Sequence, residues 1–171
     1  GKDSLIQKIS ENEPFDNCCQ LRIKGNTIKY ITSDKVTKCM DVFNAYKIFV
    51  SKSAGAPGKD LKIIGPSYIG EPHTACSDSL IPIGCFDNLS EAQNLQKYMT
   101  TKFLRFMVSI LKVSQNVTQI VYRYVPLQDF TDHSDIDWSV SIANIDKQLY
   151  KKYGLSEEEI TFIENNVKEM E

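Results

Sequence analysis

The sequence predicts an α+β fold with a mixed β-sheet, a long buried helix and a C-terminal pair of helices. Strand-like runs come early in the 171 residues, and helical patterns come late. The two kinds of segment do not alternate in the strict strand–helix–strand order that builds a parallel sheet. With 42% hydrophobic and 25% charged residues, the chain has the composition of a globular domain with one ordinary core.

The first half of the chain favours strands. A short opening helical pattern ends at Pro14. Residues 21–24 and 27–32 flank Gly25-Asn26, a dipeptide typical of tight turns, so these two runs predict a hairpin. Residues 46–51 are rich in strand-forming side chains, and residues 61–64 and 80–83 favour two further strands. We interpret residues 65–79 as an irregular link.

The second half favours helices. Asn88 or Ser90 is placed to cap a helix that runs from about 90 to 113, with an interruption near 100–101. Residues 121–125 predict a strand or extended piece that ends at Pro126. A helix over 141–153 stops at Gly154, and the last helix begins at Ser156 and runs to the end of the chain. We expect residues 1–135 to form the main domain and residues 136–171 a helical extension packed on it.

The cysteines and histidines do not predict a metal site. The five cysteines are an odd number with one adjacent pair and no C-x-x-C, which favours reduced thiols over disulfides or zinc ligation. His73 and His133 have no ligand spacing with any cysteine. The chain shows neither an apolar signal core at its start nor an apolar run long enough to span a membrane. We therefore expect a cytoplasmic protein without metal, cofactor or membrane contact.

The net charge of −2 hides a patterned distribution. Residues 1–62 carry eleven Lys or Arg and seven Asp or Glu, and residues 97–125 carry five basic residues and no acidic one. Residues 126–171 carry four basic and eleven acidic residues. Basic stretches in an acidic chain suit a polyanion-binding face, although ordinary solvated lysines give the same pattern.

A glycine-rich loop at residues 53–60 resembles a phosphate-binding P-loop only superficially. Its glycines, Gly55 and Gly58, stand too close together, and Asp60 occupies the place of the magnesium-binding Ser or Thr. We reject nucleotide hydrolysis. Because Lys52, Lys59 and Lys62 flank the loop, it is either a contact to a DNA backbone or a surface turn.

Catalytic motifs do not emerge from the sequence. A nuclease needs clustered acidic residues around a metal ion, and the acidic group at 132–137 favours a solvated turn. A nucleophile elbow, a cofactor-binding glycine strand and an Asn-Pro-Pro-Tyr type loop are all missing from the 171 residues. The chain alone is not predicted to be an enzyme.

The helical segment 102–115 predicts a basic stripe. Lys102, Arg105 and Lys112 share one helix face while the intervening residues are almost all apolar. Gln115, Asn116 and Arg123 follow, and these residue types can hydrogen-bond adenine or guanine edges. The pattern favours contact with DNA, and a solvated face with a polar helix end is the other interpretation.

Several segments taken together resemble the C-terminal region of bacterial Type II enzymes that fuse restriction to adenine-specific DNA methylation. The resemblance spans almost the whole chain in order, from Pro14-Phe15 and Ser51-Lys52 to Gly70-Glu71-Pro72 with Thr74 and Cys76. It continues through TKFLRFMVSILK with Gln115-Asn116, Val125-Pro126 with Asp129-Phe130, and the tail LYKKYGLSEEEITFIE. The segment 16–19 departs from the Pro-Phe-Gly and Arg-Thr pattern expected there.

In that family the methyltransferase core lies upstream, binds S-adenosylmethionine and holds the catalytic loop. The resemblance therefore implies a target-recognition module that holds double-stranded DNA for an upstream methyltransferase domain of the same polypeptide. We expect phosphate contacts from the basic residues and base reading from Gln115, Asn116, Arg123, His73 and Thr74. The alternatives are a protein-interaction or specificity-subunit module, or a nuclease with a scattered site.

Overall fold

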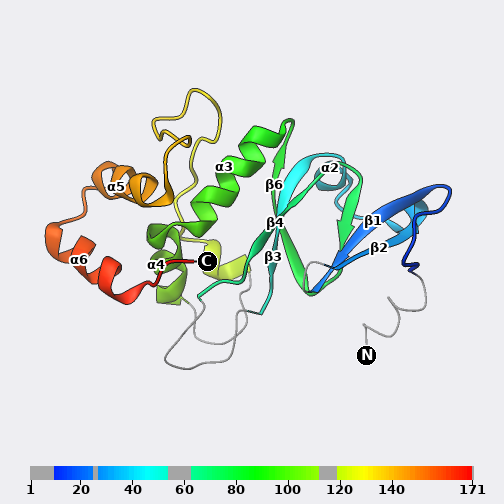
Figure 1. Cartoon of the computed structure of the whole chain (residues 1–171), viewed down its shortest axis with the longest axis horizontal. Coiled ribbons are helices and arrows are strands. Elements are labelled where there is room, and N and C mark those ends of the chain that lie inside the picture. The colour runs from blue at the N-terminus through cyan, green and yellow to red at the C-terminus, as the bar shows by residue number, and fades with distance from the viewer. Residues whose placement is uncertain (1–9, 25–26, 54–62, 112–118, 171) are drawn as a thin grey trace. The chain divides into compact units, whose positions relative to one another are not determined.

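The computed structural model of the chain describes residues 10–24, 27–53, 63–111 and 119–170. It confirms the α+β class: two three-stranded sheets precede a series of helices (Figure 1). The chain divides into two compact units. Unit 1 comprises Gly1–Lys52 and Pro66–Ala92, and unit 2 comprises Ser53–Gly65 and Gln93–Glu171. The predicted domain division after residue 135 stays a prediction.

Unit 1 contains both sheets. In the first, β1 (Cys18–Ile23) lies between its antiparallel partner β2 (Thr27–Thr32) and the parallel strand β5 (Thr74–Cys76). In the second, β3 (Tyr46–Ser51) lies between β4 (Ser67–Gly70) and β6 (Leu80–Phe86), and both pairs are antiparallel. The predicted hairpin and the strands at 46–51 and 80–83 are thus confirmed, and the first sheet is mixed.

Two strand predictions in this region were wrong. Strands β4 and β5 lie inside segment 65–79, which the sequence predicted to be an irregular link. They are only four and three residues long and carry no apolar alternation, so sheet pairing rather than local pattern defines them. Of the strand expected at 61–64, the described residues Ile63 and Ile64 form a bend.

The core of unit 1 follows from strand geometry. Cys19 and Leu21 on β1 face the same side, as alternate residues must, and pack with Ile31 and Phe43. Residues 47–50 of β3 are all buried because this strand is central and is covered on both faces. Between β2 and β3 the chain forms a 3-10 turn, η2 (Ser33–Lys35), and one turn of helix, α2 (Met40–Phe43), neither of which was predicted.

The helices that follow match the predicted pattern closely. A single pattern at 90–113 is two helices, α3 (Leu89–Thr100) and α4 (Lys102–Leu111), separated at the predicted interruption. Asn88 caps α3 by accepting the Glu91 N–H at 3.0 Å. The extended piece predicted at 121–125 was wrong, because the chain there forms a 3-10 turn, η3 (Gln119–Tyr122). Helices α5 (Ile142–Lys152) and α6 (Glu157–Asn166) form the predicted pair, although α6 ends before the chain does.

The interruption between α3 and α4 is stabilised by polar groups. The Thr101 hydroxyl donates to the Tyr98 carbonyl and accepts from the Leu104 N–H. The carboxylate of Asp146, on α5, accepts from the first two N–H groups of α4, those of Lys102 at 3.0 Å and Phe103 at 2.9 Å. Helix α4 thus begins at Lys102 because side chains satisfy its open N–H groups.

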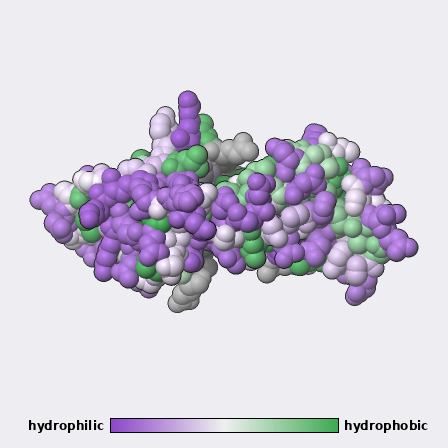
Figure 2. Space-filling model, turned by 90° about the horizontal axis from the view of Figure 1, so that it is seen from above, coloured by the Kyte–Doolittle hydropathy of each residue, from purple (hydrophilic) through white to green (hydrophobic). Residues whose placement is uncertain are grey.

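Unit 2 is built around α4, which packs against both α5 and α6 (Figure 1). Two groups of aromatic rings reinforce it: Tyr98, Phe130 and Trp138 lie within 6.0 Å of one another, and Phe103 stacks on Tyr153 at 5.0 Å. Within the described ranges, the helices lack the combined length and hydrophobicity needed to cross a membrane. On the face seen in Figure 2, hydrophobic residues form small patches among hydrophilic ones.

Candidate nucleic-acid interface

The predicted DNA-contacting residues fall into three groups. Lys59, Lys62, Lys112, Gln115 and Asn116 lie outside the described residues. The others are described, three in each unit: Lys52, His73 and Thr74 in unit 1, and Lys102, Arg105 and Arg123 in unit 2.

Arg105 is a structural residue and not part of an exposed stripe. Its side chain is 7% exposed, and Nε donates to the carbonyls of Thr100 and Thr101, both at 3.2 Å. Its Nη1 donates to the carbonyl of Lys168 at 2.6 Å, which ties α4 to the segment after α6. Burial lowers the pKa of the guanidinium. Two of the three guanidinium nitrogens of Arg105 thus donate inside the protein, and its phosphate contact stays a prediction.

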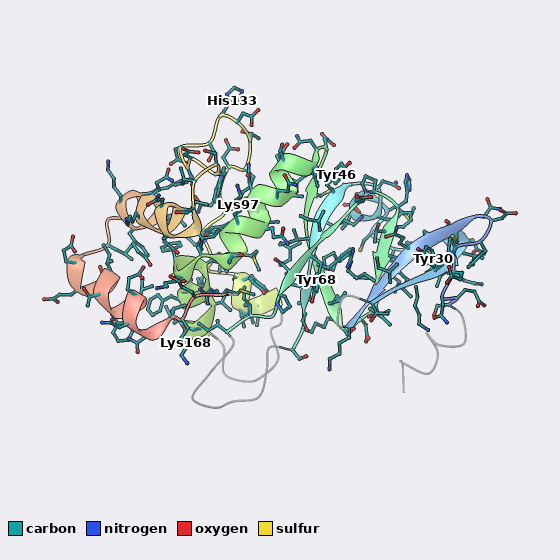
Figure 3. The ribbon with its side chains drawn as sticks, viewed as in Figure 1. Tyr30, Tyr46, Tyr68, Lys97, His133 and Lys168 are labelled. Atoms are coloured by element: carbon teal, nitrogen blue, oxygen red, sulfur yellow. The ribbon has the colours of Figure 1, made fainter. Side chains whose placement is uncertain are left out.

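Lys102 is also neutralised within unit 2. Its ammonium lies 2.5 Å from the carboxylate of Glu164, on α6, which also accepts from the Tyr150 hydroxyl at 2.8 Å. Figure 3 shows Lys168 just beyond α6, where the chain returns toward α4. The acidic C-terminal helix therefore covers the described part of the expected basic stripe. The sequence separates Lys102 and Glu164 by 62 residues, so helix periodicity could not reveal the pairing.

Unit 1 contains a pocket of about 340 Å³. Its walls are mainly apolar and come from both sheets and the segment around α2, with Leu21, Phe43, Phe49 and Pro82 among them. The polar residues that line it are Lys35, Thr37, Lys38, Cys39, Lys47, Thr74 and Cys76. Among the described lining residues, three are lysines and none is acidic. The pocket therefore combines an apolar interior with positive charge.

Lys47 places a buried cation at this pocket. The residue is 1% exposed, and Nζ donates to the carbonyls of Phe43 and Ala45 at 3.0 Å and of Glu71 at 2.7 Å. The Phe43 and Phe49 rings lie 6.0 and 5.8 Å from Nζ, close enough for cation–π attraction. Burial lowers the pKa of Lys47 to about 8, so the ammonium still predominates at neutral pH. Nowhere in the described part of the chain does a carboxylate pair with it.

The other two lysines are accessible. Lys35 and Lys38 are both exposed and line the pocket, so they lie at its mouth. Asp34 lies beside Lys35 without lining the pocket; a hydrogen bond from Thr32 and, more weakly, the charge of Lys35 lower the pKa of its carboxyl. Lys38 makes no ion pair with a described residue.

Thr74 and His73 connect this pocket to the sequence prediction. Thr74 lines the pocket and is 4% exposed, yet its hydroxyl has no hydrogen-bond partner among the residues that the structure describes. His73 is exposed and adopts φ 61°, and its N–H donates to the Phe43 carbonyl at 2.8 Å. The imidazole packs edge-on against Phe43 at 5.5 Å. Both residues were predicted to read bases, and both lie at or beside the pocket.

Arg123 lies on an exposed surface of unit 2. Its guanidinium lies 5.9 Å from the centre of the Tyr124 ring, and Tyr124 is 62% exposed. Ile120 and Leu127 on the same segment are 66% and 90% exposed. None of the described acidic residues forms an ion pair with Arg123. Arginine beside exposed aromatic and aliphatic side chains is typical of surfaces that bind a macromolecule.

The sequence analysis did not single out any of the three lysines that line the pocket. Lys35, Lys38 and Lys47 contribute to the basic excess of residues 1–62, and that excess was their only signal. Their convergence depends on the unpredicted turns η2 and α2. Among the residues with described positions, groups of three His, Cys, Asp or Glu side chains arranged to hold a metal ion are absent.

Comparison with known proteins adds no assignment. No protein-family model matches the chain, and neither a curated protein nor a solved structure matches it.

Proposed function

We propose that the chain is a sequence-specific DNA-recognition module of a restriction–modification adenine methyltransferase. The observation that supports this most is the pocket of unit 1, where three lysines converge without a lining carboxylate in a chain of net charge −2. Phosphate contacts dominate nucleic-acid affinity, and lysines not neutralised by carboxylates are the groups that make them.

The assignment of roles follows exposure. Lys35 and Lys38 at the pocket mouth and the exposed Lys52 bind backbone phosphates. Arg123 and His73, both exposed, contact bases in this proposal. Lys102 and Arg105 have no role in this proposal, since their charged groups are engaged within unit 2. Lys59, Lys62, Lys112, Gln115 and Asn116 keep their predicted DNA contacts.

In this proposal another domain carries out the methylation reaction. An upstream methyltransferase domain of the same polypeptide binds S-adenosylmethionine and modifies the target adenine, while the present chain selects and holds the duplex. The chain itself is not an enzyme, needs no cofactor and works in the cytoplasm.

A second function is favoured by one specific observation. Ile120, Tyr124 and Leu127 expose large apolar side chains on one short segment, which suits a protein partner as well as DNA. In that case the segment docks on another domain or subunit, and Arg123 contributes to the contact.

A salt titration of duplex binding tests the proposal. We expect fluorescence anisotropy of a labelled duplex to give an affinity that falls linearly on a log–log plot against salt, by a slope of about −0.9 per phosphate contact. Replacing Lys35 and Lys38 together by alanine should reduce the slope by about 2. Affinity that does not change with salt, or no binding at low salt, would reject DNA recognition and favour the protein-docking function.

A further inference from the structure

The Thr74 side chain presents a hydroxyl to the unit 1 pocket. It lines the unit 1 pocket at 4% exposure, and no described residue hydrogen-bonds with it. The hydroxyl can therefore donate a hydrogen bond to, or accept one from, a group that enters the pocket. A ligand with a polar edge inside the pocket would supply such a group.

The pocket also has a shape and charge that restrict its ligand. Its volume of about 340 Å³ falls near the lower end of small-ligand pockets, so it takes one compact group and not a peptide. The Phe43 and Phe49 rings line its interior, which suits a flat ring system. Lys35 and Lys38 at the mouth and the buried ammonium of Lys47 favour a ligand with negative charge.

A nucleotide unit meets all three requirements. Its base is flat and carries donors and acceptors on its edge, and its phosphate is anionic. We infer that the unit 1 pocket binds one nucleotide unstacked from DNA, with the base inside against Phe43 and Thr74 and the phosphate at Lys35 and Lys38. This inference rests on the proposed DNA-recognition function and names the part of the DNA that enters the protein.

Entry of a base requires that it first leave the duplex stack, which costs a few kcal/mol for a paired base and much less for an unpaired one. A duplex with one unpaired nucleotide should therefore bind more tightly than a fully paired duplex, by about tenfold. An unpaired abasic sugar-phosphate lacks the base and should show little of this advantage. The hydroxyl of Thr74 should account for about fivefold of it, as one hydrogen bond to a buried group does.

The experiment compares three labelled duplexes by anisotropy: fully paired, with one unpaired nucleotide, and with one unpaired abasic residue. Each is titrated with the intact chain, with Thr74→Val, and with the control Thr27→Val, an exposed threonine on β2 that does not line the pocket. We expect Thr74→Val to reduce the preference for the base-containing bulge by about fivefold while binding the paired duplex as before. Thr27→Val should behave as the unchanged chain.

The outcomes separate the two proposals. Tight, salt-dependent binding of all three duplexes without any preference for the unpaired base would overturn the nucleotide pocket and leave DNA recognition standing. If Thr74→Val keeps the full preference for the unpaired base, the proposed binding of a nucleotide in this pocket would also be overturned. If none of the duplexes binds at low salt, both proposals fail. Free deoxynucleoside monophosphate, titrated on its own, distinguishes the pocket's source of nucleotide: tight binding of the free nucleotide, together with no preference for the unpaired base, would assign the pocket to free nucleotides and overturn entry from DNA.

Discussion

Replacing Lys47 by methionine removes a buried charge from unit 1 while keeping a similar unbranched side chain. The ammonium of Lys47 is held by the carbonyls of Phe43, Ala45 and Glu71 and is 1% exposed. Burial disfavours its protonated form, which lowers the pKa from the ordinary 10.5 to about 8. The pH dependence of stability should therefore differ between the two proteins.

The sign and size follow from proton linkage. Because the folded pKa is the lower one, this residue's contribution to stability is complete above pH 10.5 and is lost as the pH falls through about 8. Between pH 7 and pH 9, linkage with these two pKa values raises the free energy of unfolding by about 1.3 kcal/mol. Lys47→Met lacks this increase. The difference in the free energy of unfolding between the two proteins should therefore change by about 1.3 kcal/mol from pH 7 to pH 9.

Urea unfolding at pH 7, 8 and 9, under reducing conditions that protect the free thiols, measures the effect. Lys52→Met removes an exposed lysine and serves as the control, which should follow the unchanged protein. Parallel stability curves for Lys47→Met and the unchanged protein would refute the claim that Lys47 is a desolvated cation.

Two further predictions concern packing and helix capping. Gly70→Ala should lower the free energy of unfolding by about 1–3 kcal/mol in urea denaturation, as overpacking does. A methyl group there would lie 2.8 Å from one ring carbon of Phe49 and closer still to another, and the ring is 1% exposed. Asp146→Ala should lower the free energy of unfolding by about 3 kcal/mol, because one buried and one partly buried N–H group at the start of α4 lose their acceptor.

Both predictions have a direct control. If the methyl group meets the Phe49 ring, Gly70→Ala should cost less in a Phe49→Leu background, and an equal cost in both backgrounds would contradict the packing argument. Asp135 forms an exposed ion pair with Lys152 at 2.7 Å, so Asp135→Ala should change stability by no more than about 1 kcal/mol. A similar cost for Asp135→Ala and Asp146→Ala would contradict the capping role.

The sequence predicted those helices whose ends are specified by residues within or next to the helix. The capping box at the start of α6, where Ser156 accepts from the Glu159 N–H and Glu159 accepts from the Ser156 N–H, lies within four residues. The stop after α5 depends on Gly154, which adopts φ 64°. By contrast, β5 is a three-residue strand whose pairing partner, β1, lies more than fifty residues earlier in the chain. A strand defined by such a distant partner leaves little trace in its own residues.

The candidate site was predictable only in part, for the same reason. Exposure of a charged residue depends on what packs over it, and helix periodicity showed that Lys102 and Arg105 share a face without showing that α6 and the segment after it cover that face. His73 and Thr74 were singled out from the resemblance, and their place at a pocket came only with the structure. The pocket depends on turns that bring Lys35 and Lys38 toward Lys47, and no local pattern encodes that approach.

Alkylation of Cys39 is the most direct test of the central claim that DNA occupies the unit 1 pocket. Cys39 is a free, exposed thiol that lines the pocket, and Cys85 is a free, exposed thiol that does not, so one protein carries both probe and control. Iodoacetamide labelling, followed by mass spectrometry of each peptide, gives the two rates with and without saturating duplex. We predict that bound DNA slows modification of Cys39 and leaves the rate at Cys85 unchanged. An unchanged Cys39 rate on protein shown to be saturated with DNA would contradict it.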